Sequence, residues 1–295
     1  MLHIIMDLVK NDINVIKYIE KIIMNDNIKF KLFFHYNQKY TIYELLTNVF
    51  IILKKGISFR EISKYTNICW NTIYKFFIKL SKHNVICEMY KNTINMYLSE
   101  INKIEINKTE INKNYNYLYI DSSIVSNKYG INDISINPQL KKHKSSKFSI
   151  IIDSYGIPID CNVYKSSIND AKIADMQINN IIINHPLLCL NNNVLVGDAA
   201  YDSNNIREKL KNNKIGTLLT PKNKRNIKNK DILEKQKLTL IEKLILNKRI
   251  LVEHTINKYK QFKRINIRYD KKSINYKTFL CMTSYLIFNK LTKFC

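Results

Sequence analysis

The sequence predicts an α+β or α/β protein in which a mixed sheet, flanked by helices, follows a small all-helical domain. Up to about residue 100, apolar residues recur every three or four positions, as on the buried face of a helix. From residue 116 the period shortens to two, and strand-like segments then alternate with helix-like ones. We place the boundary in the Lys- and Asn-rich repeat between these parts, which gives domains 1–112 and 113–295.

The helical domain contains a candidate helix-turn-helix over residues 58–82. Ser58 is placed to cap a first helix that runs to about Tyr65, and Asn71 to cap a second one after a short break. Thr72 and Lys75 lie off the apolar side of the second helix, so we expect them to contact DNA. Any small helical bundle gives a similar pattern, and plain packing or dimerisation is the alternative.

The second domain begins with three predicted strands. The last two are expected to form a hairpin through Ser154, Tyr155 and Gly156. Helices and strands then alternate, which implies a mixed sheet covered by helices. The predicted strands are YLYIDSSIV, FSIIIDSYG, IPIDCNVYK, NNVLVGD and IGTLLTP, and the predicted helices are SINDAKIADMQINNIII and DSNNIREKLKNN.

Positive charge is concentrated in the second domain. The chain has 48 Lys and Arg against 24 Asp and Glu, a formal charge of +24 that favours a polyanionic partner. An A/T-rich genome would also encode many lysines, so the location of the charge matters more than its sum. Residues 222–230 contain no acid, and residues 241–275 are strongly basic. The expected DNA-contacting residues here are Lys222, Arg225, Lys263 and Arg264.

The six cysteines are scattered, without a CxxC pair, which argues against a zinc ribbon or a disulfide framework and favours reduced thiols. No signal-peptide pattern opens the chain. The apolar stretch from Thr278 to Phe288 is too short to cross a bilayer. We therefore expect a soluble intracellular protein, in the cytoplasm or nucleus, with no membrane partner.

Three carboxylates stand where they could meet at one point. Asp121 and Asp198 each follow an apolar strand-like run, and Glu253 lies on a basic helix. Oxygen ligands suit Mg²⁺, and two such ions can activate the attacking oxygen and stabilise the leaving oxygen of a phosphodiester. Arg249 and Lys260 lie within roughly 60° of Glu253 around the helix, placed to grip phosphates. For Glu253 alone, an ordinary ion pair with Arg249 would be the simpler interpretation.

The chain resembles the DDE transposases of bacterial-type insertion sequences, whose catalytic domain is ribonuclease-H-like. The resembling segments are YIDSS, KFSIIIDSYGIPIDCNVYKSSINDAKI, VLVGDAAYDS and the spacing Arg249-x3-Glu253-x6-Lys260. The resemblance spans roughly residues 52–291. It departs at Leu246, where the family often has Tyr, and at KSSKFS, where Gly and His are common.

The resemblance implies that Asp121, Asp198 and Glu253 bind two Mg²⁺ or Mn²⁺ ions, and that Arg249 and Lys260 contact DNA. It further implies cleavage at the element ends and transfer of the 3′-hydroxyl to target DNA. Both DNAs would be double-stranded, and a homodimer would hold the two ends together in the synaptic complex. The alternatives are a catalytically inactive or domesticated DNA-binding regulator, and a ribonuclease-H-like nuclease without strand transfer.

Overall fold

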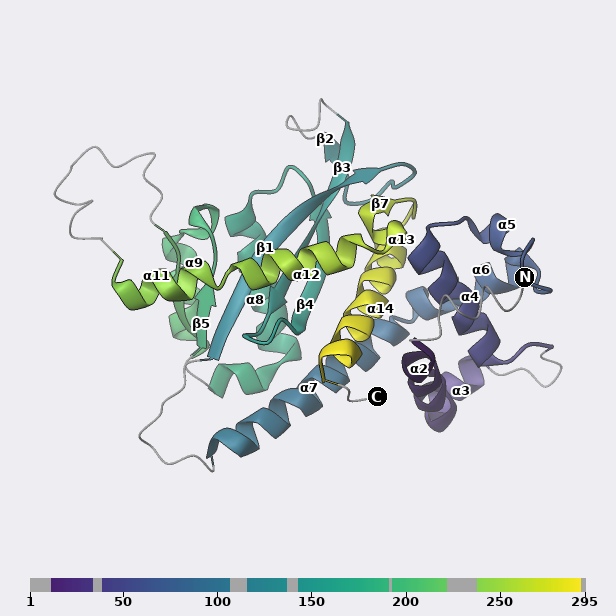
Figure 1. Cartoon of the computed structure of the whole chain (residues 1–295), viewed down its shortest axis with the longest axis horizontal. Helices are drawn as coiled ribbons and strands as arrows, with labels where there is room; N and C mark the ends of the chain where they lie inside the picture. Colours follow the sequence, from purple (N-terminus) through teal and green to yellow (C-terminus); the bar gives the residue numbers. More distant parts are fainter. Residues whose placement is uncertain are drawn as a thin grey trace. The chain divides into compact units, whose positions relative to one another are not determined.

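The computed structural model describes residues 12–33, 39–106, 116–136, 143–190, 193–221 and 238–292 (Figure 1). Its contacts divide the chain into two compact units that are not successive segments of sequence. Unit 1 comprises Met1–Tyr90, Val125–Ile134 and Lys258–Cys295, and unit 2 comprises Lys91–Ile124 and Ser135–Asn257. The boundary predicted at residue 112 lies outside the described residues.

Helices make up most of unit 1, as the apolar periodicity predicts. The long helix α7 (Val85–Ile106) begins in unit 1 and continues into unit 2. In the part of the chain that the structure describes, no helix is both long and apolar enough to cross a membrane. The other helices of unit 1 are α2 (Ile13–Asn25), α3 (Asn27–Phe33), α4 (Ile42–Lys55), α5 (Phe59–Ile62), α6 (Trp70–Lys82), α13 (Lys263–Asn266) and α14 (Ser273–Thr292).

The caps of α5 and α6 correct two details of the predicted helix-turn-helix. Ser58 does cap α5, because its hydroxyl accepts the Glu61 N–H, but this helix ends after a single turn at Ile62. Helix α6 begins at Trp70, with Cys69 in the cap position and no side-chain cap bond. The predicted cap at Asn71 is therefore wrong, since Asn71 already lies inside the helix.

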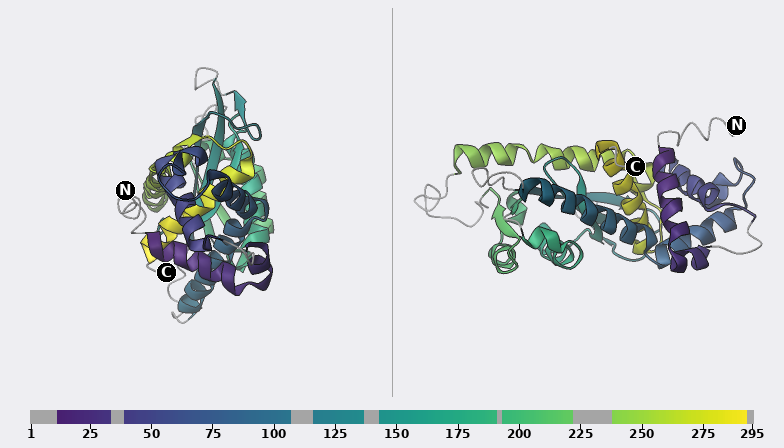
Figure 2. Two further views of the ribbon diagram at one scale, coloured as in Figure 1. Left: turned by 90° about the vertical axis from the view of Figure 1, so that its right-hand side faces the viewer. Right: turned by 90° about the horizontal axis from the view of Figure 1, so that it is seen from below.

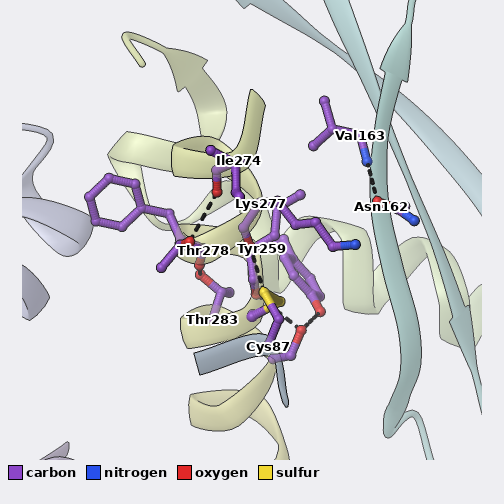
Figure 3. The surroundings of a disulfide bond; sticks show 12 residues. Cys87, Asn162, Val163, Tyr259, Ile274, Lys277, Thr278 and Thr283 are labelled. Atoms are coloured by element: carbon purple, nitrogen blue, oxygen red, sulfur yellow. Dashed lines mark hydrogen bonds between the residues drawn. A yellow bond between two sulfur atoms is a disulfide. The ribbon is translucent and has the colours of Figure 1, made fainter. Parts of the chain in front are cut away.

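Helix α14 forms the centre of unit 1, and all of its residues from Asn275 to Phe288 except Lys277 are buried. Phe279 stacks on Phe77 of α6, with ring centroids 4.5 Å apart. A disulfide joins Cys281 of α14 to Cys87 of α7 (Figure 3). The expectation that all cysteines are reduced is therefore wrong for this pair, whose partners are 194 residues apart in sequence.

The sheet is mixed and flanked by helices, as predicted. Its strand order is β2-β3-β1-β5-β6, with β4 pairing β3 and the short β7 pairing the end of β1. The β1–β5 and β5–β6 pairs are parallel, whereas β3–β4 is antiparallel. The strands are β1 (Asn116–Asn127), β2 (Ser135–Ile136), β3 (Lys144–Ile152), β4 (Pro158–Lys165), β5 (Asn193–Val196), β6 (Gly216–Leu219) and β7 (Ile267–Arg268).

The predicted hairpin between β3 and β4 is present. Gly156 has a φ of 82°. Asp153 is a turn residue, because its Oδ1 accepts the N–H groups of Tyr155 and Ile157, at 2.9 and 2.8 Å. Its other oxygen accepts the Tyr97 hydroxyl at 2.7 Å. Asp153 is therefore a buried part of the fold and not a surface residue.

Two pairs of helices flank the sheet in unit 2. Helices α8 (Asp170–Asn184) and α9 (Asn204–Asn212) lie together on one side, below the sheet in the right-hand view of Figure 2. Helix α11 (Leu240–Asn247) and the unit 2 part of α12 (Ile250–Lys260) lie on the opposite side. Two 3-10 turns, η3 (Pro186–Leu190) and η4 (Ala199–Tyr201), flank β5.

Substitution of Gly216 by alanine is expected to destabilise this sheet strongly. Gly216 has a φ of 145°, and an added Cβ would overlap the carbonyl oxygen of Asn193 on the neighbouring strand β5. Backbone strain and overlap in a paired strand together cost about 3 kcal/mol or more. Urea denaturation checks this. Thr217→Ala is the control, because Thr217 is exposed at the next position of β6.

Candidate active site

Strand pairing brings the two predicted aspartates to adjacent strands. The parallel register of β1 and β5 runs from Asn116 opposite Asn193 to Tyr119 opposite Val196. Asp121 and Asp198 each lie two residues past the last of these pairs, and the charge of Asp198 raises the pKa of Asp121. Neighbouring strands lie about 4.8 Å apart, and side chains two residues apart point to the same face. The two carboxylates therefore emerge side by side where β5 ends.

Each aspartate is oriented by a backbone N–H. The Asp121 Oδ1 accepts the N–H of Ser122 at 2.8 Å. The Asp198 Oδ1 accepts the N–H of Ala200, also at 2.8 Å, and so caps the 3-10 turn η4. These hydrogen bonds fix one oxygen of each carboxylate, which is the kind of preorganisation a ligand site requires.

Glu253 reaches the same place from α12. Val252 is fully buried, and the Thr255 hydroxyl donates to the carbonyl of Gly156 at the β3–β4 turn. This side of α12 holds it to the sheet, while Glu253 is 50% exposed. Tyr259 of α12 is also fully buried, whereas Leu244 of α11 is 65% exposed.

Arg249 lies between the carboxylates. Its Nη2 donates to Glu253 Oε1 at 2.9 Å, and its Nη1 is 3.7 Å from Asp198 Oδ2. The side chain is only 22% exposed, and Nη1 is buried without a hydrogen-bond partner in the described residues. Arg249 therefore acts as a counter-ion for two of the three acids.

Asp121 is the most buried of the three acids, and burial raises its pKa to about 6. The Ser122 N–H and the charge of Arg249 lower this pKa, whereas the charges of Asp198 and Glu253 raise it. The mutual influence of the three carboxylates shows that they belong to one electrostatic cluster. Such a perturbed group is typical of a functional site.

The cluster suits divalent cations because of the type of ligand atoms that it offers. Three carboxylates supply hard oxygen ligands, as Mg²⁺ and Mn²⁺ prefer. Their three negative charges face one guanidinium, whose Nη1 has no hydrogen-bond partner in the described residues. Among the described residues, no three His, Cys, Asp or Glu side chains are gathered closely enough to hold a metal ion as they stand. The donor set suits a divalent metal ion, while in this structure Arg249 pairs with two of the three carboxylates.

A second layer of polar residues behind Asp121 was not predicted. The Ser122 hydroxyl donates to Asp170 Oδ1 at 2.6 Å, and the buried Lys147 ammonium donates to the same oxygen at 3.0 Å. Tyr201 is fully buried nearby, and burial together with the charges of Asp170 and Asp121 raises its pKa. Asp170 lies in the first turn of α8, but its partners on β1 and β3 could not be read from the sequence.

The predicted DNA contacts outside this cluster differ in accessibility. Thr72 and Lys75 are exposed on α6, Lys263 is exposed on α13, and Lys260 is half-buried at the end of α12. The structure corrects the prediction that Arg264 contacts DNA. Its side chain is 6% exposed and makes a two-pronged ion pair with Asp270, so it is not available to a phosphate.

The remaining predicted contacts, Lys222 and Arg225, lie outside the described residues. Their proposed role therefore rests on the basic character of residues 222–230 alone.

Comparison with solved structures finds complexes of one transposase. The chain has 10% identity to the "Mos1 transposase paired-end complex with left transposon end", with a TM-score of 0.26, covering 78% of this chain and 82% of that one. For the "Mos1 mariner paired end complex with Mn" the values are 11% identity, a TM-score of 0.26 and coverage of 83% and 86%. At this level the likeness carries no further conclusion. No curated protein matches the chain.

The family model provides the assignment. The model described as "Transposase DDE domain" matches residues 114–287, which is more than half of the chain. The matched region includes β1, β5 and α12, the three elements that carry Asp121, Asp198 and Glu253. The chain therefore belongs to the DDE-domain transposase family.

Proposed function

We propose that the protein binds the ends of a DNA element, hydrolyses phosphodiester bonds there and joins the freed 3′-hydroxyl to target DNA. The single observation that carries this proposal is the electrostatic cluster around Arg249. It gathers Asp121, Asp198 and Glu253, residues up to 132 positions apart, at the end of β5. A structural ion pair would need one acid, not three.

In this proposal, Asp121, Asp198 and Glu253 hold two Mg²⁺ or Mn²⁺ ions. When bound, such ions activate the attacking oxygen and stabilise the leaving oxygen of an in-line displacement. The backbone N–H groups of Ser122 and Ala200 keep the aspartates oriented. Arg249, released from the carboxylates, would bind a DNA phosphate through its planar guanidinium.

The proposed DNA-contacting residues outside the cluster are Thr72, Lys75, Lys260 and Lys263, together with Lys222 and Arg225. Charge complementarity supports this role for a chain of +24. The domain boundary at residue 112 remains part of the proposal, as does a homodimer that brings two element ends together.

A DNA-joining assay tests the function. The substrate is a duplex of the element end with its flank, 5′-end-labelled on the strand whose 3′-hydroxyl is to be joined, with a supercoiled plasmid as the target and Mg²⁺ or Mn²⁺ present. Labelled plasmid is the expected product. Nicks without joined product would indicate a nuclease, and binding without cleavage would indicate a regulator.

Arg249→Gln is expected to reduce cleavage roughly 10²-fold, because one charge-assisted contact to the reacting phosphate is lost. Affinity for divalent cations should not fall, since Arg249 competes with them for Asp198 and Glu253. The matched control is Lys243→Gln on α11, which removes one exposed positive charge of the same unit. Cleavage by Arg249→Gln at the rate of the unmodified protein would limit Arg249 to an ion-pair role.

A further inference from the structure

Unit 1 contains a cavity whose lining includes none of the residues of the acidic cluster. Its volume is about 660 Å³, within the range of ligand sites. The lining residues are Asp12, Lys54, Lys55, Lys258, Gln261, Phe262, Lys263, Leu286, Ile287, Asn289, Lys290 and Leu291. Five of these twelve are lysines, and we refer to the site as the five-lysine cavity.

The lysines come from separate parts of the chain. Lys54 and Lys55 end α4, Lys258 and Lys263 come from α12 and α13, and Lys290 lies in the last turn of α14. A lysine in the last turn of a helix stabilises that helix by about 0.3–1 kcal/mol, wherever the helix lies. This stabilisation acts within each helix separately. It therefore does not explain why lysines from several helices line the same cavity.

The fold brings these basic ends together closely. Gly56, with a φ of 68°, ends α4, and a Cβ added there would lie 2.8 Å from the Cβ of Lys263. This contact between α4 and α13 leaves no room for a side chain at residue 56. This packing holds Lys54 and Lys55 near Lys263, at the cost of repulsion among like charges.

One acid partly offsets this repulsion. The buried Asp12 forms an ion pair with Lys54, so the lining keeps a net charge of four positive. Lys55, Lys263 and Lys290 are exposed, so the cavity reaches the surface at their side chains. Phe262, Leu286 and Leu291 add apolar surface to the lining. Such a concave basic site suits an anion that meets several ammonium groups at once.

We infer that the five-lysine cavity binds the phosphodiester backbone of DNA outside the active site. This inference rests on the proposed function, which makes DNA the polyanionic partner. Lysine ammonium groups on flexible stems bind phosphates as point charges, without reading the base sequence. The cavity thereby adds affinity for DNA in unit 1, whereas the three carboxylates of the proposed active site lie in unit 2.

Salt dependence of DNA binding tests the inference. The variant Lys55→Gln/Lys263→Gln/Lys290→Gln removes the three exposed lysines of the cavity. The control Lys17→Gln/Lys21→Gln/Lys31→Gln removes three exposed lysines of the same unit that do not line it. Binding to a labelled duplex is measured in EDTA from 50 to 300 mM salt, so that no cleavage is needed.

For the cavity variant, the slope of log K against log salt should become shallower by about 2–3, since each lost phosphate contact removes roughly 0.9. Affinity near 100 mM salt should fall at least about tenfold. The control should keep the slope of the unmodified protein to within about 0.5. An unchanged slope for the cavity variant, or an equal change in both variants, would overturn the inference. Failure of the unmodified protein to bind DNA would instead refute the proposed function.

Discussion

Asp121→Asn is expected to lower the rate of DNA cleavage at least about 10³-fold, as are Asp198→Asn and Glu253→Gln. Each change keeps the shape of the side chain but removes a negative oxygen ligand, so the divalent ions lose part of their site. DNA binding should stay within about threefold of the unmodified protein, because affinity depends chiefly on Lys and Arg contacts with phosphates. Single-turnover cleavage of a labelled duplex measures the first effect, and fluorescence anisotropy measures the second.

The matched control for this series is Glu208→Gln. Glu208 is exposed on α9 in the same unit and has the same carboxylate chemistry as Glu253. It should cleave at an unchanged rate. Because the three site residues act as one unit, double variants should be little worse than single ones. Full cleavage by any of the three single variants would remove that residue from the active site.

Asp121→Asn should also make the metal-free protein more stable above pH 6. The pKa of Asp121 is about 6 in the folded chain against an ordinary value of 3.8, because burial disfavours the charged form. The folded state therefore holds the proton more tightly, and stability falls as the pH rises from about 4 to 6. Above pH 6 the ionised Asp121 costs up to about 3 kcal/mol, whereas asparagine carries no such cost.

Urea denaturation in EDTA at pH 4, 6 and 8 measures this difference. The unmodified protein and Asp121→Asn should differ least at pH 4 and most at pH 8. Glu208→Gln should show no such trend, since Glu208 is exposed. A difference between Asp121→Asn and the unmodified protein that does not change with pH would contradict the burial of a charged Asp121.

The sheet and the acidic residues could be predicted because their signals are local. Alternating apolar residues mark the strands, and Gly156 marks the turn of the β3–β4 hairpin. Asp121 follows the buried Ile120 of β1, Asp198 comes just past the end of β5, and these two strands are paired in parallel. The Arg249–Glu253 spacing predicts an ion pair one helical turn apart, which the structure contains.

Other features depend on contacts that no local pattern encodes. The sequence predicts Arg264 as a DNA contact. The tertiary fold instead buries it against Asp270 and the rings of Phe59 and Phe279. Unit 1 draws on three stretches of sequence, and no local pattern encodes contacts between such distant stretches. The cap of α6 also differs, because the helix begins one residue before the expected Asn71.

The most direct test is a crystal structure of the protein bound to a cleaved DNA end and soaked with Mn²⁺, with the anomalous signal of manganese measured. Two peaks are expected, each within about 2.5 Å of carboxylate oxygens. Asp121 and Asp198 should share the ions, Glu253 should complete the second site, and Arg249 should have moved to a DNA phosphate. Manganese bound elsewhere, with no peak touching Asp121, would contradict the proposed active site.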